Sequence, residues 1–393
     1  MKSSSPFNNI STFSSHAVDR LETFSEKYDL ISPDIIPLSV ADMDFPCMKE
    51  ITEEFNERIL IPNYGYSFRG RDFYSSVKNR IERLYNWKIE ESWIEFTPGV
   101  GAGVAFSILS LSSPGSIVLT QPPVYPVFKR LALNNGRNVV ENPMYRDGSR
   151  FVIDFDDLEK KLKNAGLLIL CNPHNPTGRV FTREELERLG RLCLDNNVFI
   201  VSDEIHSDIV QETYHHTPIA SVSREIAEIT ITLMSPGKSF NLCGLSTSFA
   251  IIPDSSLKEK FQAEANKLHI DQGNIFGVIG LQTAYDKGDE WLKECNTYIS
   301  NNAVFVTEYI NLNIPLIKTY CPEGTFLMWL DFRHLGLNHN ELQKFLIEKA
   351  RIELSDGLRY GKEGEGFMRM NIGTNQNILE TALERLRKSI DEI

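Results

Sequence analysis

Six short, mostly apolar segments within residues 93–252 constrain the fold of this chain more than any other feature. They lack the alternation of apolar and polar residues that marks a half-exposed strand, and helix-like stretches separate them. One such helix opens with a capping box from Thr182 to Glu185. The segments are residues 93–96, 116–120, 167–171, 198–202, 229–233 and 249–252. This order predicts an α/β fold with a mainly parallel sheet, flanked by helices on both faces.

The C-terminal third of the sequence has a different pattern. It predicts helices and strands in the order of residues 290–311 (helix), 325–331 (strand), 340–351 (helix), 367–372 (strand) and 377 onward (helix). This pattern is typical of a smaller α+β domain. We therefore expect residues 46–285 to form a large domain, residues 286–393 a small C-terminal domain, and residues 1–45 an arm that forms part of the small domain.

Charge and cysteine spacing exclude several classes of function. The net charge of −12 over 393 residues argues against nucleic acid or an anionic membrane as the main partner. The start of the chain has no apolar core of signal-peptide length, and no later apolar run reaches 18 residues, so we expect a cytoplasmic protein. The nearest two of the six cysteines, Cys171 and Cys193, are 22 residues apart, so no metal site is expected.

Unusual loops follow the predicted strands, where ligands bind to parallel sheets. They are residues 99–103, 172–178, 203–206 and 235–238. Lys238 leaves the end of a buried strand among small residues. Desolvation of such a lysine makes its amine available for Schiff-base chemistry with a carbonyl cofactor. A solvated lysine at a strand end fits this position equally well.

The other loops also have two interpretations each. The glycine-rich loop lacks the dinucleotide fingerprint, because Val104 occupies the third glycine position, yet its helix N-terminus suits a single phosphate. Asp203 could face a ligand, or it could cap a helix or form a salt bridge. Asn175 could bind a ligand or form an Asx-turn. For His206 the alternative to a role in a site is an ordinary packed or surface histidine.

The loops taken together resemble the fold-type I pyridoxal 5′-phosphate (PLP) enzymes. The resemblance is closest to the cystathionine β-lyase branch, related to MalY and PatB, of the class I/II aminotransferase family. The motifs that carry it are Val40-Ala41-Asp42-Met43-Asp44-Phe45, Tyr64-Gly65-Tyr66, Gln121-Pro122-Pro123-Val124-Tyr125, Asn172-Pro173-His174-Asn175-Pro176, Ser202-Asp203-Glu204-Ile205-His206, Ser235-Pro236-Gly237-Lys238 and Trp329-Leu330-Asp331-Phe332-Arg333. This resemblance implies an aspartate aminotransferase-like large domain with a seven-stranded sheet.

The resemblance also implies roles around the cofactor ring. Lys238 would hold the cofactor covalently and then remove the Cα proton of the substrate. Asp203 would pair with the protonated ring nitrogen, which keeps the ring an electron sink. Asn175 would donate to the phenolic oxygen, which His206 would also face. Tyr125 would stack on the ring.

The phosphate and the substrate have their own implied contacts. The amides of Val100 and Gly101 and the hydroxyl of Ser235 would bind the phosphate. Tyr64 would reach it from a second subunit, which makes the expected active unit a homodimer. The other two implied contacts concern the substrate: Arg369 would bind the α-carboxylate by two parallel hydrogen bonds, and the backbone near Ala41 would close over the substrate.

The expected reaction is β-elimination from cystathionine or another cysteine S-conjugate, which gives a thiol, pyruvate and ammonia. A class I/II aminotransferase with an unknown amino donor is the alternative, because transamination uses the same residues. A cofactor-binding regulator without turnover is a third possibility, which the presence of Lys238 and Arg369 disfavours. Ser246 stands where many family members carry a phosphate-binding arginine, and Pro236-Gly237 precedes Lys238 where the branch usually has serine.

Overall fold

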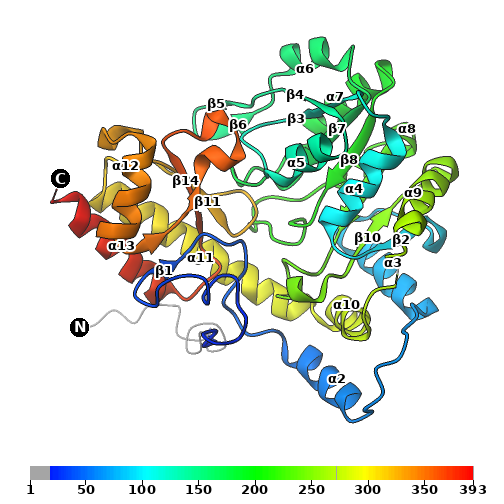
Figure 1. The fold of residues 1–393 in the computed structure, drawn as a ribbon, viewed down its shortest axis with the longest axis horizontal. Helices are drawn as coiled ribbons and strands as arrows, with labels where there is room; N and C mark the ends of the chain where they lie inside the picture. The colour runs from blue at the N-terminus through cyan, green and yellow to red at the C-terminus, as the bar shows by residue number, and fades with distance from the viewer. Residues whose placement is uncertain (1–17, 271, 393) are drawn as a thin grey trace.

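The larger part of the molecule is built around a seven-stranded, mostly parallel sheet (Figure 1). The computed structural model describes residues 18–270 and 272–392. In the order β2-β10-β9-β8-β7-β3-β4, only β10 runs antiparallel to its neighbours. The strands are β2 (Ile94–Thr97), β3 (Ile117–Thr120), β4 (Asn138–Glu141), β7 (Leu167–Cys171), β8 (Phe199–Asp203), β9 (Thr230–Met234) and β10 (Ser248–Ile251). The predicted fold class is confirmed.

Helices bury both faces of this sheet, which explains why its strands lack polar alternation. In β7, Ile169 packs with α4 (Val100–Leu111), α5 (Val127–Asn134) and α9 (Ser255–Leu268). Leu168 and Leu170 pack on the opposite face, with α6 (Phe155–Leu162), α7 (Arg183–Asp195) and α8 (Arg224–Glu228). A third cluster covers β2 and β10 with α2 (Lys49–Ile59), α3 (Arg71–Tyr85) and α10 (Ile275–Lys287).

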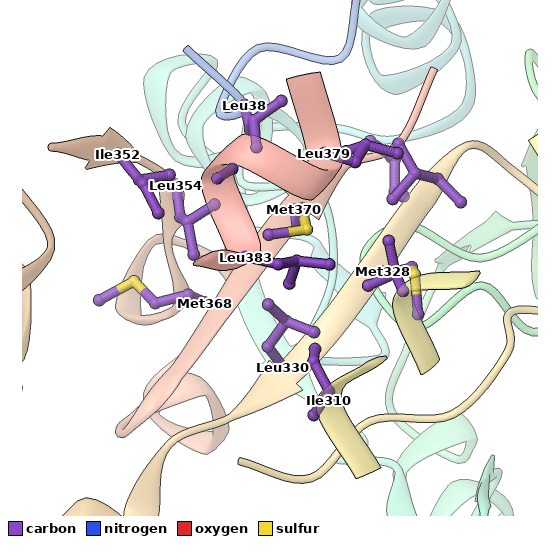
Figure 2. Packing of buried hydrophobic residues seen from close by; sticks show 14 of the residues in the cluster. Leu38, Ile310, Met328, Leu330, Ile352, Leu354, Met368, Met370, Leu379 and Leu383 are labelled. Atoms are coloured by element: carbon purple, nitrogen blue, oxygen red, sulfur yellow. The ribbon is translucent and has the colours of Figure 1, made fainter. Parts of the chain in front are cut away.

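The second part of the chain is built on a three-stranded sheet with the order β11-β14-β13. Its elements are α11 (Asp289–Asn313), β11 (Leu327–Asp331), α12 (His339–Lys344), β13 (Ser355–Asp356), β14 (Phe367–Asn371) and α13 (Gln376–Ile390). Figure 2 shows Met328 and Leu330 of β11 and Met370 of β14 packing with Leu383 of α13. A helix is predicted over 340–351. In its second half the structure has a π-helical turn at Phe345–Lys349, in which the backbone hydrogen bonds span five residues instead of four.

The N-terminal segment packs on this second part rather than on the large sheet. Strand β1 (Ile36–Pro37) pairs in parallel with β12 (Ile352–Glu353), and Leu38 lies in the same core as α13 (Figure 2). Residues 1–17 of the expected arm lie outside the described residues. The domain limits at 45 and 285 stay predictions. In the described part of the chain, no helix combines the length and the apolar character needed to cross a membrane.

Candidate active site

A cavity of about 370 Å³ opens beyond the carboxyl ends of β7, β8 and β9. Strand β14 and residues 39–41 complete its wall, so distant parts of the chain meet there. The structure brings together ten of the predicted site residues: Ala41, Val100, Gly101, Tyr125, Asn175, Asp203, His206, Ser235, Lys238 and Arg369. Tyr64 does not line this cavity. It lies 58% exposed, with its ring 6.1 Å from that of Phe276.

Lys238 is half-buried just after β9, in a turn that is tightly braced. Its Nζ donates a hydrogen bond to the carbonyl oxygen of Ala41 at 2.5 Å. The turn is fixed by Ser235, whose hydroxyl donates to the Thr247 carbonyl at 2.7 Å and accepts from the Gly237 amide at 2.9 Å. The turn thus directs the lysine amine toward the backbone that closes the cavity.

Asp203 is the last residue of β8, and its carboxyl group is buried in the cavity wall. Burial raises the pKa of Asp203 to about 7, although the hydrogen bond from the Ile205 amide and the charge of Lys238 both act to lower that pKa. The adjacent Glu204 points elsewhere and pairs with His216 at 2.8 Å. A carboxylate desolvated to this degree favours a cationic ligand atom beside it.

Arg369 projects from β14 and is only 4% exposed. It donates to Oδ1 of Asn175 at 3.0 Å and to the carbonyl oxygen of Ser39 at 2.6 Å. Its guanidinium lies over the Tyr360 ring at 5.3 Å. Among the described residues it has no carboxylate partner, and its Nε is unpaired. A buried guanidinium held in this way suits an anionic ligand such as a carboxylate.

Two rings line the cavity between these charged groups. His206 is buried with Nδ1 unpaired among the described residues, and its ring meets Phe326 edge-on at 5.7 Å. Burial, with the charges of Lys238 and Arg369, lowers the pKa of His206 well below its ordinary value, so the ring is neutral. Tyr125 is 37% exposed and packs edge-on against Phe128 at 5.6 Å, which leaves its ring accessible from the cavity.

The N-terminus of α4 forms a polar corner of the cavity. Gly99, with φ of 101°, turns the chain into the helix, and its carbonyl accepts from the amides of Ala102 and Gly103. The amides of Val100 and Gly101 begin the helix and therefore have no carbonyl partner within it. Nothing lies within 4 Å of where a Cβ on Gly101 would be, so there is open space beside this residue. The corner suits a phosphate group.

Sequence reasoning missed several lining residues, among them Glu26, Ser39, Cys243, Arg359 and Tyr360. They lie in irregular segments whose sequence periodicity predicts neither strand nor helix. The one available signal is the glycine-rich stretch 357–366, which indicates a tight turn before the strand that carries Arg369. That signal does not show which side chains face the cavity.

Comparisons with known proteins agree with this geometry. The family described as "Aminotransferase class I and II" matches residues 33–386. Cystathionine beta-lyase PatB of Bacillus subtilis is 38% identical, with 95% of this chain and 98% of that protein covered. The structure of cystalysin from Treponema denticola, which contains pyridoxal 5′-phosphate, superposes with a TM-score of 0.93 at 31% identity and covers 96% and 98% of the two chains.

The PLP-bound C-S lyase from Staphylococcus hominis is also similar, with a TM-score of 0.90, 29% identity and coverage of 96% and 98%. The resemblance found in the sequence is therefore confirmed. This chain belongs to the class I and II aminotransferase family.

Proposed function

We propose that this protein is a PLP-dependent C-S lyase that cleaves cystathionine or related cysteine S-conjugates by β-elimination. The observation that carries the proposal is the single cavity in which the amine of Lys238 and the buried guanidinium of Arg369 lie together. An amino-acid substrate needs both groups, a base at Cα and a cation at its carboxylate. The names of the relatives at 29–38% identity support the lyase branch of the family.

The residues present fit PLP in three ways. Asp203 offers a desolvated carboxylate for the protonated ring nitrogen. The first amides of α4 offer donors for the phosphate. Lys238 is the only lysine among the described residues that line the cavity, so it is the amine that can bond to the cofactor aldehyde.

Asn175 and His206 add polar atoms to the same wall. Because Oδ1 of Asn175 accepts from Arg369, its amide NH₂ is the group left to donate to the cofactor.

The chain's own residues bind the substrate and move its proton. PLP, when bound, supplies an electron sink for the charge left at Cα. Arg369 holds the α-carboxylate, and Nζ of Lys238 takes the Cα proton. The Cβ–S bond then breaks with its electron pair on sulfur, and the thiolate takes up a proton. The released 2-aminoacrylate reacts with one water to give pyruvate and ammonia.

Replacing Asp203 with Asn is expected to stabilise the cofactor-free protein while it weakens the cofactor-bound enzyme. The folded-state pKa of Asp203, about 7, lies above the ordinary value of 3.8. The free energy of unfolding therefore falls as pH rises from 3.8 to about 7, and it stays at the lower value above pH 7. Asn carries no charge, and its oxygen can still accept from the Ile205 amide. Thermal unfolding should therefore show that the free energy of unfolding of D203N exceeds that of the unmodified protein by a few kcal/mol at about pH 8. At about pH 5 this difference should be less than half as large.

The same substitution should reduce turnover, because the ring nitrogen loses its anionic partner. A D203N protein that is less stable than the parent at about pH 8 without cofactor would contradict the proposed burial of this charge. The matched control is Asp195→Asn, at the end of α7 and outside the cavity wall.

Replacing Ser246 with Arg is expected to tighten cofactor binding by about tenfold, because a charge-assisted bond to phosphate is worth about 1.5 kcal/mol. Ser246 lines the cavity in the left-handed region with φ of 47°, a backbone strain that Ser and Arg share. Titration of the cofactor-free protein with PLP, followed by absorbance, measures the dissociation constant. Ser246→Gln, uncharged and of similar length, is the control. Equal affinities of S246R and S246Q would show that the phosphate does not bind near this residue.

A homodimer in which Tyr64 reaches the partner's phosphate is part of the proposal. Support comes from an exposed apolar surface around that residue, where Leu60, Tyr66 and Phe68 are 81%, 97% and 82% exposed. Apolar residues gathered in this way favour burial against another protein surface. Sedimentation at twice the chain mass of 44.8 kDa would support the dimer, and sedimentation at that single mass would exclude it. The cytoplasmic location stays a prediction.

The function is tested by assaying pyruvate and free thiol from cystathionine with no amino acceptor present. A lyase forms both products under these conditions. Formation of a keto acid only when a 2-oxo acid is added would support the alternative of an aminotransferase.

A further inference from the structure

Two exposed side chains of opposite charge, Glu26 and Arg359, line the same cavity as Lys238 and Arg369. The reaction proposed above uses neither of them. Within the described residues, neither side chain forms a hydrogen bond or an ion pair, and the two do not pair with each other. Each can therefore take a ligand partner without giving up an existing one.

Arg359 is carried by a braced turn rather than a loose loop. The turn is the short helix η6 (Gly357–Tyr360), in which the Leu358 amide donates to the side chain of Asp356. The carbonyl oxygen of Tyr360 accepts from the Val124 amide at 2.8 Å, which ties the turn to the loop carrying Tyr125. A Cβ at Gly357 would meet the Gly364 carbonyl at 2.2 Å, so the start of η6 packs closely against the backbone of the next helical turn, η7 (Lys362–Gly364).

The turn also places Arg359 near the group that holds the substrate carboxylate. Its neighbour Tyr360 lies under the guanidinium of Arg369. The pKa of Arg369 is lowered mainly by burial, and the charge of Arg359 adds to this effect. An exposed positive charge therefore lies close enough to the buried Arg369 to act on it.

Glu26 is held by the residues on either side of it. The Ser25 amide donates to Asp29 at 2.8 Å, and the buried ammonium of Lys27 donates to Asp44 at 2.7 Å. Lys27 also donates to the carbonyl oxygen of Asp42, next to the Ala41 that meets Lys238. The glutamate is thus anchored on the segment that covers the cavity.

We propose that Arg359 and Glu26 bind the far end of a substrate that has an amino-acid group at both ends, such as L-cystathionine or L-cystine. Arg359 would take the distal carboxylate, and Glu26 the distal ammonium. This assignment rests on the proposed lyase function and narrows its substrate class to cysteine conjugates with a zwitterionic substituent on sulfur. Placing one charge of each sign in one cavity matches a zwitterion better than it matches an alkyl group.

The test compares L-cystathionine with S-ethyl-L-cysteine, which shares the reacting end and lacks the charged far end. For L-cystathionine, Arg359→Gln and Glu26→Gln should each raise KM about fivefold and leave kcat unchanged, because exposed charge pairs contribute little energy. KM for S-ethyl-L-cysteine should stay within about twofold for both variants. The control is Arg224→Gln on α8, an arginine outside the cavity wall whose side chain is 89% exposed.

The outcomes separate the two proposals. If the unmodified protein cleaves both substrates but the variants change both equally, or neither, the assignment of Arg359 and Glu26 is wrong and the lyase function stands. If the unmodified protein releases pyruvate from neither substrate, the lyase function itself fails and takes the assignment with it.

Discussion

Replacing Lys238 with Ala is expected to lower kcat for β-elimination by at least about 10³-fold, because the cavity then loses its amine base. Lys238 is the only lysine among the described lining residues, so no other lysine amine is placed to replace it as the base. Ala41 loses the hydrogen bond to its carbonyl oxygen, which a water can replace. The measurement is single-turnover formation of pyruvate with saturating cofactor.

The lower kcat of K238A should come from the missing base and not from a loss of folding or of cofactor binding. K238A should still bind PLP reversibly through Asp203 and the amides of α4, seen as an absorbance band that gel filtration removes. Lys287→Ala serves as the matched control, because Lys287 is exposed and pairs with Glu54. Elimination by K238A at a rate within tenfold of the parent would rule out this lysine as the base.

Replacing Arg369 with Ala is expected to reduce kcat/KM for amino-acid substrates by about 10²- to 10³-fold. A buried, hydrogen-bonded charge contact typically costs about 2–5 kcal/mol when one partner is removed. Arg369→Lys should recover little, since a lysine ammonium cannot form the two parallel hydrogen bonds of a guanidinium. The measurement is the dependence of pyruvate formation on substrate concentration.

The affinity for PLP and a control variant show whether the effect of R369A is specific to the substrate carboxylate. Affinity for PLP should change by less than about tenfold, although Asn175 loses the donor to its Oδ1. The control is Arg188→Ala on α7, an arginine with a 58% exposed side chain outside the cavity wall. Unchanged kcat/KM in R369A would show that the substrate carboxylate binds elsewhere.

The sequence was sufficient for six of the seven strands of the large sheet, because burial on both faces leaves a strong local signal. The segment 167–171 was predicted with the bounds of β7, and Thr182 caps α7 through the predicted capping box. The edge strand β4 was missed. Its sequence, Asn138 to Glu141, is only partly buried and therefore lacks the apolar run that marked the central strands.

The candidate site likewise contains some features that could be predicted from the sequence and others that could not. Asp203 and Lys238 could be predicted because Asp203 ends a buried strand and Lys238 lies in the turn after the next one, so the place of each at the sheet edge is set locally. The hydrogen bond between Arg369 and Asn175 could not be predicted from the sequence, because it joins residues 194 positions apart. Glu26 and Arg359 reach the cavity only through long-range packing of irregular segments, which no local pattern encodes. Assigning substrate class therefore depends on the folded structure more than assigning the cofactor does.

The most direct test of the lyase assignment is a product balance for L-cystathionine with purified protein, PLP and no 2-oxo acid. The proposed chemistry predicts pyruvate, ammonia and homocysteine in equal amounts over many turnovers. The opposite result is no detectable thiol, with keto acid formed only when an amino acceptor is supplied. That result would contradict β-elimination and assign the chain to transamination.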